Sequence, residues 1–330
     1  MRAPGFWTKP GHALALALSP VAAIYGAVAA RRLLRPGATA PVPVLCIGNF
    51  TAGGAGKTPV ALAVADRLEA LGRRPVFLTR GYGGDLREPT LVDLARHDAA
   101  ATGDEPQLLA RRAPTIVSPD RAAGALLAAR HGDVIVMDDG LQNPSLRKTA
   151  ALAVVDGATG LGNGLCIPAG PLRAPMAAQW PLVQAVAVMG EGAAGRALAD
   201  EARRRGCAVF AARLQPAAGA DALAGRRVFA FAGIGRPEKF FESLAQAGAE
   251  VAGTKSFADH QPYDARRLAR LREEATRRNL TLVTTAKDMA RLRAALPGDP
   301  LSDVGVLEVT ACFEDPAALD AWLRDRLSGP

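Results

Sequence analysis

The chain has few cysteines, few aromatic residues and few lysines. Its four cysteines lie far apart and form no C-x-x-C pair, which argues against a disulfide framework or a zinc site and for a reducing compartment. Aromatic residues make up 5% of the 330 residues, and the basic residues form scattered pairs without aromatics between them. The net charge of +8 therefore does not indicate nucleic acid. We expect an acidic membrane surface or a phosphorylated substrate as the partner.

Lysine is scarce beside arginine, with six lysines against thirty-four arginines. In such a chain each remaining lysine is a candidate for a specific role, and both Lys57 and Lys287 fall in motif-like loops. A hydrophobic content of 49% over this length can supply the cores of two packed domains.

One long stretch without formal charge covers residues 11–30, "GHALALALSPVAAIYGAVAA", and three arginines follow closely. As a helix it would be about 30 Å long, roughly the thickness of a bilayer core. A spanning helix, a signal peptide, a buried core helix and a helix lying on the membrane are all open. Its many alanines and the Ser-Pro pair in its middle weaken the spanning alternative, and export would remove a nucleotide-dependent domain from the cytosol. We favour a helix lying on the membrane, with its arginines against anionic headgroups.

After a Pro- and Gly-rich linker, short apolar runs alternate with helical stretches. Strands are predicted near 44–48, 75–79, 115–118, 133–138, 151–156 and 183–189, and helices near 58–71, 105–112 and 120–131. This alternation predicts an α/β fold with a doubly wound, mostly parallel sheet of the P-loop NTPase type. A similar alternation resumes after about residue 214, with strands near 227–232, 281–285 and 304–309 and helices near 237–247, 263–278 and 315–327. We expect an N-terminal helix and linker (1–38), a core domain (39–214) and a smaller α/β domain (215–330).

The stretch "FTAGGAGKTP" after the first strand ends like a phosphate-binding loop. The pattern G-x-x-x-x-G-K-[ST] requires a glycine where this chain has Thr51, but Gly53 and Gly54 can provide the same freedom to turn. Backbone N–H groups of such a loop wrap phosphates at a helix N-terminus, and a lysine adds a point charge. An ordinary strand-to-helix turn is the alternative. The predicted nucleotide-binding residues are Thr51, Ala52, Gly53, Gly54, Ala55, Gly56, Lys57 and Thr58.

A second motif, "VIVMDDG", is an apolar strand that ends in two acidic residues, Asp138 and Asp139. P-loop enzymes place their Mg²⁺-binding carboxylate at such a strand end, although strand-end aspartates are also common turn formers. Together with the Thr58 hydroxyl, Asp138 and Asp139 are the predicted metal ligands.

Several other clusters carry less information when taken alone. "TRGYGG" reads as a glycine-rich turn, "GNGLCIPAGPLRAP" as a long ordered loop that could hold a substrate, and "FADHQPY" contains one of four histidines. In "TGDEP", Asp104 could simply be the N-cap of a helix. "TTAKD" has a weak likeness to the base-reading loops of P-loop proteins.

Taken together, these stretches resemble the tetraacyldisaccharide 4'-kinase family, the lipid A 4'-kinases of Gram-negative envelope synthesis. The resemblance extends from the N-terminal apolar segment to "TTAKD", and the Thr-x-Gly-Gly-x-Gly-Lys-Thr loop is the family's own form. The motifs that carry it are "GNFTAGGAGKTP", "TRGYGG", "GDEP", "DDGLQN", "GNGLCIPAGPLR" and "FADH", in that order.

The resemblance implies a reaction. These enzymes transfer the γ-phosphate of ATP, with Mg²⁺, to the 4'-hydroxyl of a tetraacylated disaccharide 1-phosphate at the cytoplasmic face of the inner membrane, and the product is lipid IVA. It implies Asp104 as the general base, His260 as its assistant, and Lys57 as the catalytic phosphate-loop lysine. We expect a monomer, held on the membrane through its N-terminal helix. The predicted residues for binding the lipid substrate are Arg80, Tyr82, Gln142, Asn163 and Arg173.

The chain departs from the family pattern at two positions. Ala174 stands where a glutamate is frequent, and Asn143 stands where a histidine is frequent. Two rival functions remain: a P-loop kinase of another lipid or sugar, and a nucleotide switch or metallochaperone-type NTPase without a phosphoryl acceptor. The last should carry partner-binding or metal-ligand clusters, and the sequence shows none.

Overall fold

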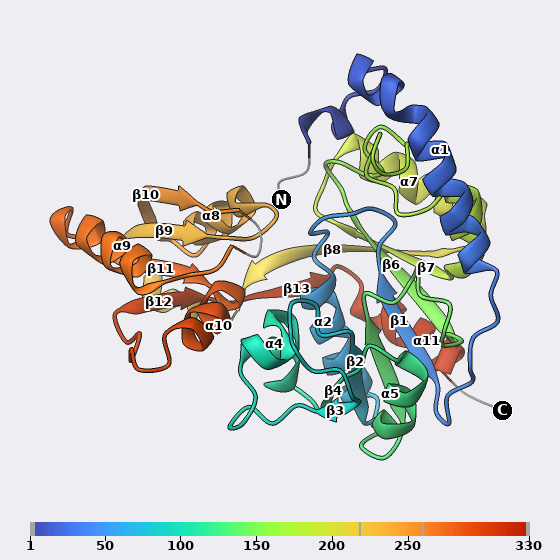
Figure 1. The fold of residues 1–330 in the computed structure, drawn as a ribbon, viewed down its shortest axis with the longest axis horizontal. Helices are drawn as coiled ribbons and strands as arrows, with labels where there is room; N and C mark the ends of the chain where they lie inside the picture. Colours follow the sequence, from blue (N-terminus) through green and yellow to red (C-terminus); the bar gives the residue numbers. More distant parts are fainter. Residues whose placement is uncertain (1–3, 218, 259–260, 328–330) are drawn as a thin grey trace.

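The structure is a computed structural model, and it describes residues 4–217, 219–258 and 261–327. Two sheets organise the chain, one of nine strands and one of four. Figure 1 shows the four-stranded sheet in a separate lobe, joined to the larger body where β8 and β13 run between the two. The fold is α/β, with a large, mostly parallel sheet and a smaller parallel one, as the sequence predicts.

The large sheet has the order β13-β8-β7-β6-β1-β5-β2-β4-β3. Neighbouring strands pair in parallel except at the two ends, where β13 and β3 are antiparallel. Short apolar runs buried on both faces are typical of parallel sheets covered by helices, and β1 and β5 are buried at every residue. The strands are β1 (Val44–Gly48), β2 (Pro75–Thr79), β3 (Thr90–Leu91), β4 (Thr115–Val117), β5 (Val134–Asp138), β6 (Ala150–Asp156), β7 (Ala185–Met189), β8 (Ala208–Pro216) and β13 (Val309–Phe313).

Helices cover both faces of this sheet, and alternate strand residues contribute to two separate cores. On β1, Leu45 and Ile47 pack into one core, while Val44 and Cys46 pack into the other. The first core includes side chains of α2 (Lys57–Ala70), α4 (Asp104–Ala110) and α11 (Pro316–Leu327); the second includes those of α5 (Arg121–Ala128) and α7 (Ala193–Arg204). Short helices α3 (Ala99–Thr102), α6 (Met176–Gln179), η1 (Gly5–Thr8), η2 (Trp180–Leu182) and η3 (Ala220–Leu223) complete the connections.

The small sheet has the order β10-β9-β11-β12, with all neighbours parallel. Its strands are β9 (Arg227–Ala232), β10 (Glu250–Ser256), β11 (Thr281–Thr285) and β12 (Val304–Leu307). Helix α8 (Pro237–Gln246) packs into one core of this lobe, and α9 (Ala265–Arg277) and α10 (Ala286–Ala295) pack into the other. Two hydrophobic cores therefore flank this sheet as well.

After the small lobe the chain returns to the large one. Strand β13 pairs with β8, and Leu319, Trp322 and Leu323 of α11 enter the same core as α2. The Arg67 guanidinium on α2 bonds the Asp320 carboxylate on α11, with Nε 2.8 Å from Oδ1. The last strand and helix thus complete the larger lobe, while the predicted boundaries at 38/39 and 214/215 stay predictions.

The N-terminal apolar stretch forms α1 (Ala13–Leu33), which runs along the outer edge of the larger lobe (Figure 1). Within the described residues it is the one helix long and apolar enough to cross a membrane by length and composition, which is weak evidence for a span. Only Ala15, Ala22 and Gly26 are buried, and a Cβ at Gly26 would meet Cys166 Sγ and Pro175 Cγ at 3.2 Å. A narrow stripe of small residues therefore holds α1 to the protein and leaves its larger side chains outside.

Candidate active site

The phosphate loop follows β1 at the edge of the sheet where the parallel strands end. Gly53 and Gly56 have φ values of +111° and +89°, which favour glycine, and Gly56 caps α2 without a side chain. A Cβ added at Gly53 or Gly54 would meet no atom within 4 Å, so this side of the loop is open. On its other side, the Ala52 amide donates to the Pro171 carbonyl at 2.7 Å. The loop has the shape and the open face that a phosphate needs.

Lys57 begins α2 and points toward the end of β5. Its Nζ lies 3.7 Å from Asp139 Oδ2, and its side chain is 10% exposed. Arg173 donates hydrogen bonds to the same carboxylate from both terminal nitrogens, from Nη1 to Oδ1 at 2.6 Å and from Nη2 to Oδ2 at 3.1 Å. Burial alone would raise the pKa of Asp139, but the charges of Lys57 and Arg173 outweigh it and lower this pKa to about 2. Asp139 thus stays ionised and orients two cations beside the loop.

Asp138 is the buried neighbour of Asp139, and its environment is the opposite. The residue is 1% exposed, and neither carboxylate oxygen has a hydrogen-bond partner among the described residues. Burial, together with the negative charge of Glu105, raises the pKa of Asp138 to about 7. A buried carboxylate without donors requires a counter-charge, and no cation of the described residues bonds to Asp138.

Mg²⁺ fits this donor set. It commonly binds one or two carboxylates and takes its remaining ligands from water and substrate phosphates. Asp138 supplies orphaned oxygens, Asp139 follows it directly, and Thr58 lies buried in the first turn of α2. Within the described residues no cluster of three or more His, Cys, Asp or Glu side chains forms a closed metal site. The open, oxygen-only arrangement suits a metal that arrives with a nucleotide.

Asp104 is the first residue of α4, and Gly103 occupies the cap position, so Asp104 is not the N-cap that its local sequence allows. The residue is 5% exposed. Its Oδ2 accepts a hydrogen bond from Arg291 Nε at 3.0 Å, and its Oδ1 accepts one from the Glu105 amide at 3.2 Å. The next residue, Glu105, accepts from Lys287 Nζ at 2.6 Å. The first turn of α4 is therefore bound to two cations of α10, which belongs to the other lobe.

A second contact joins the lobes at the end of β6. Asp156 Oδ2 lies 2.6 Å from Arg236 Nη1 and also contacts Lys239 Nζ, both on the small lobe. Burial opposes ionisation of Asp156, but the bonds to Lys239 and Arg236 outweigh it and lower its pKa to about 2. The small lobe is thereby fastened at a second point along the edge that carries the phosphate loop.

The predicted substrate residues lie in different settings. Arg80 is exposed, and Tyr82 is 66% exposed. Gln142 accepts from Arg173 Nη1 at 3.4 Å and donates to the Asn49 carbonyl at 2.7 Å, which places it behind the phosphate loop. Asn163 donates to the Ala169 carbonyl at 2.9 Å, and its Oδ1 accepts from the Leu165 amide, so its side chain shapes its own loop. Their roles as substrate ligands stay predictions.

His260 lies outside the described residues, so its predicted partnership with Asp104 stays a prediction. Two described residues near it in sequence, Phe257 and Tyr263, make specific contacts. The Tyr263 hydroxyl donates to Asp288 Oδ1 at 2.8 Å, and the Tyr263 ring packs against Phe257 with centroids 5.6 Å apart.

Three residues of the site have no role in the sequence prediction: Glu105, Lys287 and Arg291. Glu105 stands in the recognised "GDEP" motif, and the scarcity of lysine singles out Lys287 without showing what it touches. Arg291 is one arginine of thirty-four, and no local pattern distinguishes it. Its partner is 187 residues away in the chain, so only the packing of α10 on α4 reveals it.

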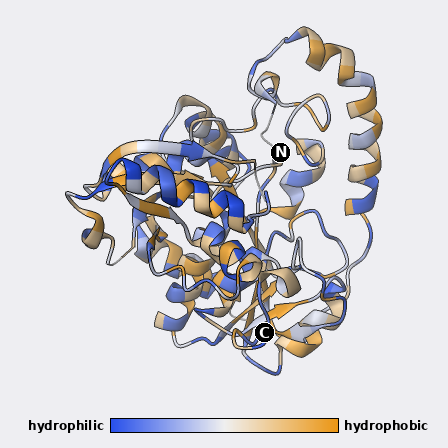
Figure 2. Cartoon of the chain, turned by 60° about the vertical axis from the view of Figure 1, so that its left-hand side comes forward, coloured by the Kyte–Doolittle hydropathy of each residue, from blue (hydrophilic) through white to orange (hydrophobic). Residues whose placement is uncertain are grey.

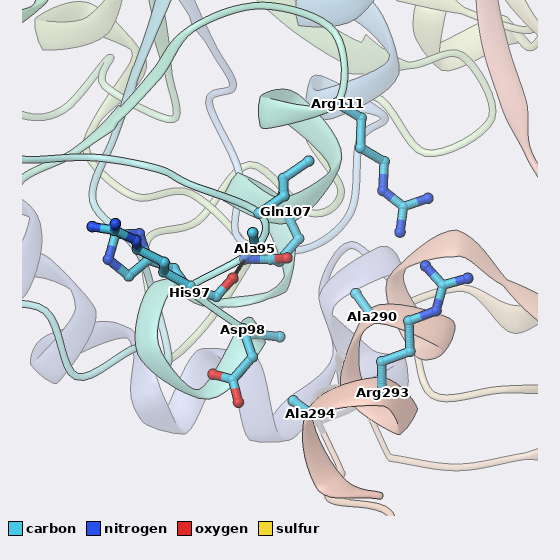
Figure 3. Close-up of a pocket in the computed structure, with 11 residues that line it drawn as sticks. Ala95, His97, Asp98, Gln107, Arg111, Ala290, Arg293 and Ala294 are labelled. Carbon is cyan, nitrogen blue, oxygen red and sulfur yellow. Dashed lines mark hydrogen bonds between the residues drawn. The ribbon is translucent and has the colours of Figure 1, made fainter. Parts of the chain in front are cut away.

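A separate hollow of about 400 Å³ lies where the 94–99 segment and α4 face α10 (Figure 3). Its lining includes Leu94, His97, Asp98, Gln107, Arg111 and Arg293. Figure 3 shows Arg111 and Arg293 projecting from the two sides, and Gln107 Nε2 donates to the His97 carbonyl at 2.9 Å. None of the residues 51–58 of the predicted phosphate loop lines this hollow.

Comparisons with known proteins agree on one relationship. The family described as "Tetraacyldisaccharide-1-P 4'-kinase" matches residues 14–328. A tetraacyldisaccharide 4'-kinase of Methylobacterium radiotolerans is 58% identical over 332 aligned positions, covering 100% of both chains. One from Methylobacterium sp. strain 4-46 is 60% identical, covering 99% of this chain and 97% of the relative. A crystal structure of LpxK from Aquifex aeolicus in complex with ATP has the same fold, with a TM-score of 0.71, 22% identity, and coverage of 95% and 99% of the two chains.

Proposed function

The chain belongs to the tetraacyldisaccharide 4'-kinase family, and we propose that its phosphate loop and Asp104 together transfer phosphate from ATP to the 4'-hydroxyl of the lipid. The enzyme is an ATP-dependent lipid A 4'-kinase: it phosphorylates a tetraacyldisaccharide 1-phosphate and forms lipid IVA. A nucleotide switch or metallochaperone is not favoured by these relatives. The family assignment does not by itself assign a binding or catalytic role to each residue of the site.

One observation carries the assignment of the site. An open glycine loop, Lys57 and the orphaned carboxylate of Asp138 lie together at the strand ends, and burial and the negative charge of Glu105 raise the pKa of Asp138. Asp104 is the neighbour of Glu105 in the first turn of α4. Phosphoryl transfer needs positioned phosphates and a carboxylate for the attacking hydroxyl, and this edge of the sheet offers both.

The residues of the loop, Thr51 to Thr58, hold the phosphates of ATP through backbone N–H groups at the start of α2. Lys57 and Arg173 then face the negative charge that develops on the transferred group, and Asp139 orients both cations before the nucleotide arrives. Asp138, Asp139 and Thr58 would hold Mg²⁺, which neutralises phosphate charge when bound.

Asp104 takes the proton of the acceptor 4'-hydroxyl. As the oxygen forms its bond to the γ-phosphorus, the bond from that phosphorus to the β–γ bridging oxygen breaks, and ADP leaves with the electron pair. Arg291 Nε and the Glu105 amide each donate a hydrogen bond to this carboxylate and orient it. His260 assists by orienting this carboxylate and taking the proton onward. Arg80, Tyr82, Gln142, Asn163 and Arg173 contribute to binding the lipid.

The acylated substrate resides in a bilayer, so the kinase must dock beside it, and α1 provides the surface. Leu16, Ile24 and Val28 are 60%, 69% and 56% exposed, more than single surface residues would explain. Figure 2 shows α1 as an apolar helix whose C-terminal end is hydrophilic, where Arg31 and Arg32 lie. We place the enzyme as a monomer on the cytoplasmic face of the inner membrane, with α1 in the interface plane.

The test is an acceptor-dependence experiment in mixed micelles. ATP consumption should require the disaccharide lipid, and labelled phosphate should appear on the lipid. Asp104→Asn should lose about 10²–10⁴-fold in kcat with ATP affinity unchanged, because an amide cannot take the proton. Asp98→Asn is the matched control, since Asp98 caps α3 and asparagine caps equally well. ATP hydrolysis independent of the lipid, or a fully active Asp104→Asn enzyme, would refute the proposal.

A further inference from the structure

Asp288 is the centre of a buried junction at the start of α10. The residue is 0% exposed, and its carboxylate accepts from the Gly233 amide at 3.1 Å, the Tyr263 hydroxyl at 2.8 Å and the Thr285 hydroxyl at 2.7 Å. These donors come from the turn after β9, from the loop of the "FADHQPY" motif and from the end of β11. A fully buried carboxylate with this many donors holds three chain segments in one arrangement.

Arg291 lies one helical turn after Asp288 and extends the junction toward the other lobe. Its Nη1 donates to the Gly233 carbonyl at 2.9 Å and lies 3.2 Å from Asp288 Oδ1, while its Nε donates to Asp104 Oδ2 at 3.0 Å. The side chain is 12% exposed. A planar guanidinium fixed on one edge by two partners presents its other donors in a set direction. Arg291 therefore holds one oxygen of the Asp104 carboxylate from the small lobe.

We propose that Arg291 is a positioning residue for Asp104, and that the chain Tyr263–Asp288–Arg291–Asp104 holds the carboxylate of the general base in place. The inference rests on the proposed function, because it assigns Asp104 to proton removal. It also gives the "TTAKD" motif a role: its aspartate binds Tyr263 and Arg291, and Arg291 in turn holds Asp104 of the other lobe. The nucleotide is bound by other residues, so the network acts on the chemical step.

The expected signature is a loss of kcat without a loss of ATP binding. Arg291→Gln removes the charge and the fork, and should lower kcat by about 10–100-fold, the range that a misplacement of about 1 Å produces. Arg291→Lys keeps the charge, but a single ammonium group cannot bond Asp288 and Asp104 from two fixed nitrogens as the guanidinium does. Its kcat should therefore lie between those of Arg291→Gln and the wild type. The KM for ATP should stay within about twofold in both variants.

Two further variants control for misfolding and for general surface effects. Tyr263→Phe removes only the hydroxyl bond to Asp288 and should lower kcat several-fold while the packed ring stays in place. Arg293→Gln changes an exposed arginine on the same helix and should leave kcat unchanged. Thermal unfolding of each variant shows which are folded at the assay temperature. If Arg291→Gln is not, Arg291→Lys and Tyr263→Phe decide the outcome.

The Asp104→Asn background separates positioning from an independent role. If Arg291 acts through Asp104, adding Arg291→Gln to Asp104→Asn should change the residual kcat by less than about twofold. The inference would be overturned if Arg291→Gln lowered kcat by the same factor in the wild type and in Asp104→Asn. Full kcat in both Arg291→Gln and Tyr263→Phe would overturn it as well. A fully active Asp104→Asn enzyme instead defeats the proposed base itself, so the two failures are distinguishable.

Discussion

Lys287 Nζ of α10 donates to Glu105 Oε1 of α4 at 2.6 Å, across 182 residues of sequence. Each side chain is about three-quarters buried, at 27% and 25% exposure. The positive charge of Lys287 lowers the pKa of Glu105, and the ionised Glu105 in turn helps to raise the pKa of its neighbour Asp138. The pair therefore does two things: it joins the lobes, and it places a negative charge beside the orphaned carboxylate.

Removing only Lys287 from this ion pair should lower the stability of the protein. Lys287→Met leaves Glu105 ionised, largely buried and close to Asp138, and should destabilise the protein by about 2–4 kcal/mol in denaturant unfolding. Lys287→Met combined with Glu105→Gln should recover part of that loss, since no unpaired charge remains. Arg111→Gln is the control, because its pair with Glu308 is exposed and contributes less than about 1 kcal/mol. Equal effects of Lys287→Met and Arg111→Gln would contradict this view of the pair.

Lys57→Ala should lose most of the phosphoryl-transfer rate. The side chain is 10% exposed beside the open loop, and we propose that its charge meets the β- and γ-phosphates as negative charge shifts in the transition state. We expect kcat to fall on the order of 10²-fold or more. Steady-state kinetics with saturating lipid measures this, and near-normal turnover would remove Lys57 from the site.

Asp138→Asn should stabilise the ligand-free protein while abolishing activity. The folded-state pKa of about 7 exceeds the unfolded value, so folding takes up a proton, and stability falls as pH rises from about 4 to about 7. The asparagine variant escapes this penalty. Its advantage in unfolding free energy should be small near pH 4 and reach a plateau on the order of 2–4 kcal/mol above pH 7. Urea unfolding at several pH values checks this prediction. If the variant were no more stable than the wild type at pH 8, the ionised Asp138 carboxylate would not destabilise the fold.

The membrane role of α1 can be tested without deleting it. Ile24→Glu places a charge on a side chain that is 69% exposed, so the fold should be unaffected while binding to anionic lipid vesicles weakens several-fold. Leu126→Glu is the matched control, because Leu126 is an exposed leucine on α5, at 58% exposure, away from α1. Deleting residues 1–35 should release the enzyme from membranes while ATP still binds. Vesicle binding unchanged in both the Ile24→Glu and the deleted protein would place the anchor elsewhere.

Much of the larger lobe could be predicted from sequence because its strands are continuous apolar runs. The predicted strands 44–48 and 75–79 coincide with β1 and β2, and the predicted helix at 58–71 is α2 within one residue at either end. The phosphate loop was equally accessible, since its glycines, lysine and threonine are adjacent in the chain. A motif whose residues are adjacent in the chain can be recognised from that short segment alone.

Strands at the sheet end were missed for a physical reason. β8 is only partly buried, with a mixture of exposed and buried residues, and β13 has one buried residue among four half-buried ones. Only the first five residues of β8 form the continuous apolar run that marks a covered strand, and Thr310 interrupts the run in β13. That β13 lies antiparallel to β8, and that α11 completes the core of α2, follows from where the chain returns after the small lobe.

The sequence by itself determined the family and predicted the phosphate loop and the acidic strand end, because each depends on residues that are neighbours in the chain. Only the tertiary structure decided what Lys287 and Arg291 do. Their partners Glu105 and Asp104 lie 182 and 187 residues away, and the two pairs form because α10 packs against α4. Long-range ion pairs leave no local pattern, since a buried, paired arginine and a solvated one have the same neighbours in sequence.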